Sequence, residues 1–290
     1  MSDTAAHIDV CPLLVIGGGS MAHAILSGAA GAGLLDGPVV VAEPDDARRA
    51  RISAVDTAID AVATVADACE ALPYEDAAVL LCVKPQMLPA VVDEIRAANG
   101  DGMLEGRCCI SILAGVTVAT LTEATGARVV RTMPNLPIAT GHGATALSAS
   151  DDATGEDLDR AHRLFGAASR VYDLPEAAID AFTGAAGSGP AYAFLMAEGL
   201  IAGVLDAGRE AGLSKDNARS IVAQTLLGAG AMLAQECRGE LPDPAELRVA
   251  VTSPGGTTAA ALDVLEARGV RDAVREAVLA AARRAGELGG

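Results

Sequence analysis

A short apolar run that ends in three glycines most constrains what this chain can fold into. Residues 12–16 (Pro-Leu-Leu-Val-Ile) are typical of a buried parallel strand, and the small residues of 20–32 predict a helix. Between them Gly17, Gly19 and Ala22 have the spacing G-x-G-x-x-A: Gly17 permits a tight turn, Gly19 lets the backbone approach a pyrophosphate, and Ala22 permits close helix–strand packing. The helix N-terminus adds free N–H groups and a partial positive charge. We therefore predict that this loop binds a dinucleotide, with a purely structural turn as the alternative. The predicted contact positions are Gly17, Gly19, Ser20, Met21 and Ala22.

The rest of the first half repeats the alternation of strand and helix. Residues 45–54 have a helical pattern. Short apolar runs typical of buried strands occur at residues 39–41, 77–83, 108–113, 129–130 and 144–147. Strands separated by helical stretches predict an α/β fold with a parallel sheet and right-handed crossovers. We therefore predict a Rossmann-type dinucleotide-binding domain over residues 1–175.

The second half has no strand pattern from about Pro175 onward. Helical patterns cover residues 176–183, 190–211, 215–237, 244–251, 257–268 and 270–287. The stretch 190–211 is apolar nearly all round, and such a helix in a soluble protein is expected to be buried on every side. A domain of about 110 residues has difficulty burying it alone. We therefore predict an all-helical domain over residues 176–290 that forms a symmetric homodimer or a higher homo-oligomer.

The acidic composition excludes several kinds of partner. The 290 residues include 38 Asp and Glu against 21 Lys and Arg, a formal net charge of −17, with no Trp, three Tyr and three Phe. Nucleic acids and anionic membrane surfaces need basic side chains to offset phosphate charge, so neither is expected as a partner. No uninterrupted apolar run reaches the ~18 residues that a membrane span needs. The pairs Asp151-Asp152 and Glu156-Asp157 are interpreted as a solvated face near a helix start.

Cysteine and histidine usage predicts neither a metal site nor a disulfide framework. The six cysteines contain no C-x-x-C pair, and the four histidines lack the spacing of metal ligands. Cys108 and Cys109 begin an apolar strand and are interpreted as core filler. The first residues are acidic, with no apolar segment of a signal peptide behind them. We therefore expect a cytoplasmic protein without a metal.

Glu43 stands at the end of the second strand, about 20 residues past the glycine loop. A carboxylate there can accept hydrogen bonds from the ribose diol of NAD, and it would repel the 2′-phosphate of NADP. Arg48, Arg49 and Arg51 follow closely and could compensate that charge. A solvated helix face is an equally good interpretation of the three arginines.

Lys84 follows a buried strand in the turn Val83-Lys84-Pro85. Loops at the carboxyl ends of parallel strands line the ligand crevice of such folds. Lys84 could act as a general acid or could position the nicotinamide ribose through backbone contacts. A surface lysine at a loop tip is the alternative.

The segment Thr252-Ser253-Pro254-Gly255-Gly256-Thr257-Thr258 is the strongest local signal of the second half. Paired glycines let backbone N–H groups turn inward, and Ser and Thr are strong helix caps. The segment predicts an anion nest at a helix N-terminus, suited to a carboxylate, with an ordinary capped helix as the alternative. A second such loop, Gly187-Ser188-Gly189-Pro190, precedes the long apolar helix, where its glycines could equally serve tight packing.

Together these segments resemble the pyrroline-5-carboxylate reductase family, in the order in which that family has them and over residues 12 to about 288. The segments that carry the resemblance are the glycine loop, Val83-Lys84-Pro85, residues 110–117 (Ile-Ser-Ile-Leu-Ala-Gly-Val-Thr), 131–137 (Arg-Thr-Met-Pro-Asn-Leu-Pro), 187–192 (Gly-Ser-Gly-Pro-Ala-Tyr) and 253–258 (Ser-Pro-Gly-Gly-Thr-Thr).

The resemblance implies an enzyme that reduces 1-pyrroline-5-carboxylate to L-proline with NADP(H) or NAD(H), the last step of proline biosynthesis. It implies that the glycine loop holds the pyrophosphate and that the 253–258 loop binds the substrate carboxylate. The hydroxyl of Thr258 would lie near the imine nitrogen and act in catalysis, and Glu198 would lie near the substrate. The resemblance implies contacts to the nicotinamide half from Val83, Lys84, Pro85, Ala114, Gly115 and Asn135. It implies substrate contacts from Glu198, Ser253, Gly255, Gly256, Thr257 and Thr258.

Two departures from the family pattern concern the cofactor. The family commonly has a small hydroxyl residue in place of Glu43, and an Asn after the third strand that residues 60–69 lack here. Both predict that NADH is accepted better than is usual in the family. Two other functions remain open: a related reductase acting on another cyclic imine acid or a 3-hydroxy acid, and a dinucleotide-binding regulator without turnover.

Overall fold

The computed structural model describes residues 10–72, 77–99, 104–235 and 240–289. The chain divides into two compact units. The first comprises the residues up to Gly187 together with those from Ala280 onward, and the second is Ser188–Leu279.

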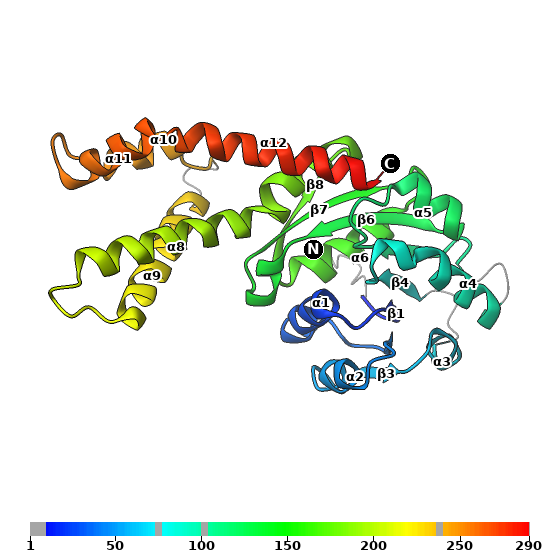
Figure 1. Ribbon diagram of the computed structural model, residues 1–290. Coiled ribbons are helices and arrows are strands. Elements are labelled where there is room, and N and C mark those ends of the chain that lie inside the picture. The colour runs from blue at the N-terminus through cyan, green and yellow to red at the C-terminus, as the bar shows by residue number, and fades with distance from the viewer. Residues whose placement is uncertain (1–9, 73–76, 100–103, 236–239, 290) are drawn as a thin grey trace, which may run out of the picture. The chain divides into compact units, whose positions relative to one another are not determined.

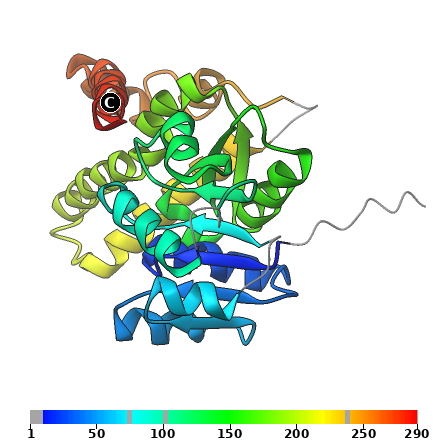
Figure 2. The same ribbon diagram turned by 90° about the vertical axis from the view of Figure 1, so that its right-hand side faces the viewer.

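The first unit is built on an eight-stranded sheet with the order β3-β2-β1-β4-β5-β6-β7-β8 (Figure 1). Its strands are β1 (Leu13–Ile16), β2 (Val39–Ala42), β3 (Ile59–Val62), β4 (Ala78–Leu81), β5 (Cys108–Ser111), β6 (Arg128–Pro134), β7 (Gly143–Ala149) and β8 (Ser169–Asp173). Strand β1, drawn in blue, lies between β2 and β4 and is parallel to both (Figure 1 and Figure 2). The order reverses at β1, which leads into the glycine loop. This confirms the Rossmann-type α/β architecture.

The sheet is not wholly parallel, so that part of the expectation is wrong. Strands β6 and β7 pair antiparallel, with Thr132 opposite Leu147. Only the short η2 turn (Leu136–Thr140) connects them, whereas a parallel pair needs a crossover of about a dozen residues or more. The edge strands β3 and β8 lack the apolar runs of the inner strands, since only Ile59 of β3 is buried and β8 has no buried residue. They were therefore not among the apolar runs of the sequence.

Helices cover both faces of the sheet because strand residues alternate between two cores. Leu13 and Val15 pack in one core with Ile25 of α1. Leu14 and Ile16 pack in the other with helices α3 and α4. The helices of this unit are α1 (Ser20–Gly31), α2 (Asp46–Ser53), α3 (Val65–Ala71), α4 (Leu88–Asn99), α5 (Val118–Thr125), α6 (Gly155–Gly166) and α7 (Ile179–Phe182), with the short turns η1 (Pro85–Met87), η3 (Glu176–Ala178) and η4 (Thr183–Gly187).

Asp157 is buried, so its interpretation as a solvated acid is wrong. Its side chain is 2% exposed and accepts hydrogen bonds from Arg128 Nε at 2.7 Å and Nη2 at 3.0 Å. Thr154 and Asp157 form a capping box at the start of α6, which turns the carboxylate toward β6. Burial by itself raises the pKa of this carboxyl, but the bonds from Arg128 and Thr154 outweigh it and lower the pKa from 3.8 to about 2.

The second unit consists of helices in the residues that the structure describes. They are α8 (Gly189–Ala207), α9 (Lys215–Ala234), α10 (Pro244–Ala250), α11 (Thr257–Ala267) and the first part of α12 (Val270–Gly289). Helices α8 and α9 lie side by side (Figure 1). The all-helical character of this part agrees with the expectation.

Helix α8 was expected to be buried on every side, and within a single chain it is not. It has no buried residue, and Phe194 and Leu195 are 59% and 70% exposed. The stretch Glu176–Ala207 is also long and apolar enough to cross a membrane by length and composition, with a mean hydropathy of 1.3. Large exposed apolar surfaces mark sites of association.

Candidate functional site

The glycine loop connects β1 to α1 at the carboxyl end of the sheet. The N–H of Gly17 donates to the carbonyl of Ala42 at 2.9 Å, and the N–H of Cys82 donates to the carbonyl of Ile16 at 2.8 Å. Gly17 has φ +101°, and a Cβ added there would lie 2.7 Å from the Cys82 carbonyl oxygen. Only glycine fits this position.

Gly19 is the N-cap residue of α1 and has an extended backbone. A Cβ added at Gly19 would meet no protein atom within 4 Å. The start of α1 therefore opens onto free space, and it carries unpaired N–H groups and a partial positive charge. This cradle fits the pyrophosphate of a dinucleotide.

A cavity of about 580 Å³ lies over this loop, at the carboxyl ends of β1, β2, β3 and β4. It brings together five of the expected cofactor contacts, namely Gly17, Gly19, Glu43, Val83 and Lys84. Its other lining residues are Ile16, Ala42, Pro44, Arg48, Ala63, Thr64, Val65, Cys82, Met87, Val91 and Glu94. Burial raises the pKa of the Cys82 thiol well above its usual range, so Cys82 contributes a protonated wall to the cavity.

The sequence interpretation missed the part of this wall that follows β3. Ala63 and Thr64 line the cavity, and the Thr64 hydroxyl accepts the N–H of Asp67 to cap α3. In the sequence, residues 60–69 after the third strand stood out only for the Asn that they lack, and no contact was predicted among them. The carboxyl ends of parallel strands line the ligand crevice, and this signal could have found Thr64.

Glu43 fastens the glycine loop to the end of β2. Its side chain is 5% exposed, and its two carboxylate oxygens accept the N–H groups of Gly18 and Asp45, each at 2.9 Å. Arg48 Nε lies 3.2 Å from Glu43 Oε1. The carboxylate therefore has a structural role at the rim of the cavity as well as a charge that faces it.

The three arginines after Glu43 have different contacts. Arg48 lines the cavity. Arg49 donates to the carbonyls of Glu43 at 2.8 Å and Pro44 at 2.9 Å. Arg51 instead reaches His23 Nδ1 at 3.5 Å. Of the three, Arg48 is the one placed to meet a ligand of this cavity.

Lys84 is exposed at the start of η1, where its carbonyl accepts the N–H of Met87 at 2.9 Å. It lines the cavity with Val83, whereas Pro85 does not. Ser20, Met21 and Ala22, the other predicted loop positions, begin α1 behind the lining residues.

The remaining predicted nicotinamide contacts lie outside this cavity. Gly115, with φ +79°, lines a separate hollow of about 390 Å³ together with Arg131 and Glu176. The Asn135 amide donates to the Ala186 carbonyl at 3.0 Å and accepts the N–H of Ala144 at 2.9 Å. Asn135 thus holds the end of β6 to the start of β7 and to η4. Ala114 immediately precedes Gly115 and lines neither hollow.

Arg131 beside Gly115 was not singled out from the sequence. It is 6% exposed, and its Nη1 lies 2.7 Å from Glu176 Oε1. The same Glu176 oxygen accepts the N–H of Val118 at 2.7 Å. The pair therefore ties β6 and the start of α5 to η3.

The predicted substrate loop lies in the second unit, between α10 and α11. Gly255 has φ +68°, and Gly256 is the N-cap residue of α11 without a side-chain cap. The expected Ser or Thr cap is therefore wrong, because glycine takes the capping position. Ser253, Thr257 and Glu198 are exposed and Thr258 is half-buried. A helix start without a side-chain cap keeps its N–H groups free for an anion.

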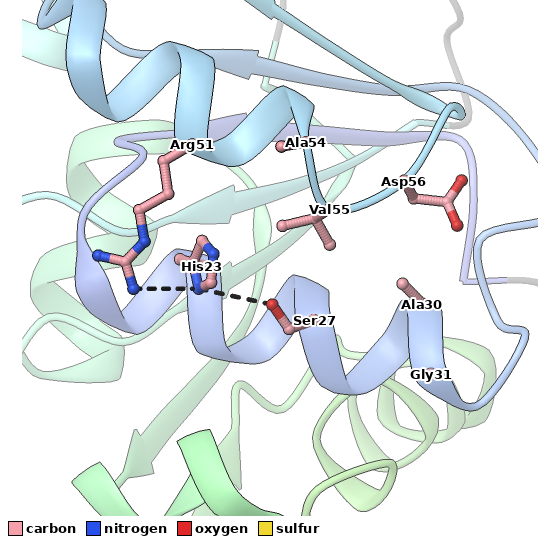
Figure 3. A pocket seen from close by; sticks show the side chains of 8 residues that line it. All are labelled: His23, Ser27, Ala30, Gly31, Arg51, Ala54, Val55 and Asp56. Carbon is pink, nitrogen blue, oxygen red and sulfur yellow. Dashed lines mark hydrogen bonds between the residues drawn. The ribbon is translucent and has the colours of Figure 1, made fainter.

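A further hollow of about 610 Å³ lies between α1 and α2 (Figure 3). His23 projects from α1 toward Arg51 of α2, and Ser27 lies next to it. Partial burial and the charge of Arg51 lower the pKa of His23 below 6.5. No described cluster of three or more His, Cys, Asp or Glu side chains there or elsewhere could hold a metal ion.

Two family models match the chain. Residues 12–115 match a model described as NADP oxidoreductase coenzyme F420-dependent, and residues 176–288 match pyrroline-5-carboxylate reductase dimerisation. Among curated proteins, the pyrroline-5-carboxylate reductase of Mycobacterium tuberculosis is 38% identical, with 95% of this chain and 96% of that protein covered. The pyrroline-5-carboxylate reductase of Pisum sativum is 35% identical, with 94% of each chain covered.

Solved structures give the same result. The pyrroline-5-carboxylate reductase of Coxiella burnetii is similar with a TM-score of 0.81 and 30% identity, over 97% of this chain and 100% of that one. The pyrroline carboxylate reductase of Plasmodium falciparum, solved with NADP bound, has a TM-score of 0.78 and 26% identity, over 96% and 98% of the two chains.

Proposed function

The chain belongs to the pyrroline-5-carboxylate reductase family, and from this premise we propose that it reduces 1-pyrroline-5-carboxylate to L-proline, the last step of proline biosynthesis, with NADPH or NADH. The observation that carries the proposal is the cavity over the glycine loop, in a chain that aligns with these reductases over nearly its whole length. The bound nicotinamide cofactor supplies the hydride. The fold supplies a cradle for it and a separate loop for an anionic substrate.

We assign cofactor binding to the first unit. The backbone from Gly17 to Ala22 holds the pyrophosphate at the start of α1. The nicotinamide half is assigned to Val83, Lys84, Pro85, Ala114, Gly115 and Asn135. Because the Asn135 amide already serves two backbone groups, its assigned role is to position the loop after β6.

We assign substrate binding to residues 176–290, the substrate-binding and dimerisation domain. The N–H groups of the loop Ser253, Gly255, Gly256 and Thr257 hold the carboxylate, and Glu198 on α8 lies on the substrate side. The Thr258 hydroxyl donates to the imine nitrogen. A cyclic imine is already polarised, so the chemistry needs orientation and one hydrogen-bond partner more than a strong acid.

Replacement of Thr258 by valine tests this assignment. We expect kcat/KM for 1-pyrroline-5-carboxylate to fall about 100-fold, because the imine nitrogen loses its hydrogen-bond donor. Thr258→Ser should retain most activity, and Thr225→Val on α9 serves as the matched control. The assay follows oxidation of the reduced nicotinamide. An unchanged kcat/KM for Thr258→Val would remove Thr258 from catalysis.

A panel of substrates separates the two alternatives. The same assay on the six-membered cyclic imine acid and on 3-hydroxy acids distinguishes a related reductase. Dinucleotide binding without turnover of any of these compounds would identify a regulator.

We propose that a second copy of the chain covers the exposed face of α8, and that the homo-oligomer is a dimer or a multiple of it. Residues 176–288 match the family model for dimerisation. This match favours a second copy of the chain, over a membrane, as the partner of α8. The net charge of −17 also disfavours nucleic acid and anionic lipid as partners. We place the enzyme in the cytoplasm, where its buried thiols stay reduced.

Replacement of Leu195 by glutamate tests the interface. A charge at the centre of an apolar interface is costly to desolvate, so the mass in solution should fall to that of one chain. Leu136→Glu, at a 59% exposed leucine of the first unit, is the control and should leave the mass unchanged. Light scattering after size-exclusion chromatography measures both. An unchanged mass for Leu195→Glu would place the interface elsewhere.

A further inference from the structure

We propose that the acidic turn after β2, residues 43–46 (Glu-Pro-Asp-Asp), makes this chain select NADH over NADPH. The inference rests on the proposed function, since it assumes that the glycine-loop cavity holds the nicotinamide cofactor. NADPH differs from NADH by a phosphate on the 2′-oxygen of the adenosine ribose. In this fold that oxygen lies at the end of the second strand, beside the glycine loop.

The carboxylate of Glu43 occupies that position at the cavity rim. A carboxylate has about four acceptor sites. Three partners engage it here, namely the N–H groups of Gly18 and Asp45 and the Nε of Arg48. Only two of these contacts are hydrogen bonds, so the carboxylate keeps acceptor capacity for a ribose hydroxyl as donor. A phosphate oxygen in the same place has no proton to donate and adds a like charge.

Groups that could receive a 2′-phosphate are already engaged by the chain's own acids. The N–H of Asp45 donates to Glu43, and the N–H of Arg48 in the first turn of α2 donates to Asp45 Oδ1 at 2.9 Å. These are backbone donors of the kind that bind phosphate at a helix N-terminus. Here they bind carboxylates instead.

The arginines do not offset this charge. Arg49 donates to two backbone carbonyls and also contacts the Asp46 carboxylate. Arg51 reaches His23, in the hollow between α1 and α2 (Figure 3). Arg48 lines the cavity, but its Nε lies 3.2 Å from Glu43 Oε1 and 3.8 Å from Asp45 Oδ1. A phosphate bound by Arg48 would therefore sit beside two carboxylates.

Equilibrium binding of each cofactor to the intact oligomer tests the proposal without requiring turnover. Isothermal titration calorimetry should give a Kd for NADH at least about tenfold below that for NADPH. Equal affinities, or tighter binding of NADPH, would overturn the proposal and leave the proposed function standing. Binding of neither cofactor would overturn the proposed function and this inference with it.

Glu43→Gln identifies the residue responsible. The amide keeps the shape and one acceptor for the Gly18 N–H, while the charge is removed. We expect the Kd ratio of NADPH to NADH to fall severalfold toward one, mainly through tighter NADPH binding. Glu123→Gln, the same change at an exposed residue of α5, is the matched control and should keep the wild-type ratio. A ratio unchanged by Glu43→Gln in a protein of normal melting temperature would refute the role of Glu43. If that variant does not fold, the ratio measured on the wild-type chain still decides the proposal.

Discussion

Gly17→Ala is expected to weaken cofactor binding strongly and to destabilise the first unit. An added Cβ would lie 2.7 Å from the carbonyl oxygen of Cys82 and 2.9 Å from its carbonyl carbon, and these are backbone atoms that cannot rotate away. The φ of +101° is also outside the range that L side chains adopt readily. Strain and clash together should cost about 3 kcal/mol of unfolding free energy. The displaced loop should raise the Kd for the reduced cofactor by about 100-fold or more.

Two other glycines provide the controls for this experiment. Gly33 also has a positive φ, +68°, but a Cβ there meets nothing within 4 Å, so Gly33→Ala should cost only about 1 kcal/mol and leave cofactor binding intact. A Cβ at Gly19 would meet no protein atom, and the backbone there is extended, so Gly19→Ala should leave the melting temperature unchanged. The added methyl group enters the space assigned to the cofactor, so cofactor binding should weaken. Thermal unfolding and calorimetric titration measure the two effects separately. Normal cofactor binding by Gly17→Ala would mean that the cavity over this loop is not the cofactor site.

Asp157→Asn is expected to lower the free energy of unfolding by about 3 kcal/mol. The substitution leaves Arg128 without its buried partner and removes the carboxylate that accepts the N–H of Thr154 at 2.8 Å. Urea unfolding at a fixed protein concentration measures the change, because stability of an oligomer depends on concentration. Asp159→Asn on the exposed side of the same helix should have little effect. Equal destabilisation by both variants would show that the ion pair contributes nothing specific.

The pH dependence provides an independent check on Asp157. Its folded pKa of about 2 lies below the value of 3.8 that the unfolded chain has. A carboxyl with a lowered folded pKa stabilises the protein above its unfolded pKa. That contribution, about 2 kcal/mol, should be lost as the pH falls from about 4 toward 2. The difference in stability between the wild-type chain and Asp157→Asn should shrink over that range.

The inner half of the sheet and its glycine loop followed from the sequence because their signals are local. Leu13 to Ile16 form a continuous apolar strand, and Gly17 and Gly19 stand where a turn and an open helix start need them. The edge strand β8 and the antiparallel return of β7 did not follow. A half-exposed edge strand carries no apolar run, and the direction of a strand depends on the length of its connection, not on its composition.

Five of the predicted cofactor contacts meet in one cavity, because the sheet brings the carboxyl ends of their strands together. Glu43 and Lys84 are 41 positions apart in the chain, yet both follow strands adjacent to β1 and lie at its carboxyl end. Spacing in the sequence predicted that such residues face a crevice. It could not predict that Glu43 also binds the Gly18 N–H, because a buried hydrogen bond across 25 residues has no local signature.

The sequence by itself determined the fold class, the inner strands with their glycine loop, and the family, because each depends on residue type and spacing along the chain. Only the tertiary structure decided that Arg48 lines the cavity over the glycine loop and that Asp157 is a buried partner of Arg128. It also decided that Asn135 and Arg131, outside that cavity, fasten β6 to η4 and to η3. Charged and amide side chains have the same sequence signature when solvated and when buried. Their role is set by the partner that the fold brings within about 3 Å, which lies far away in the sequence.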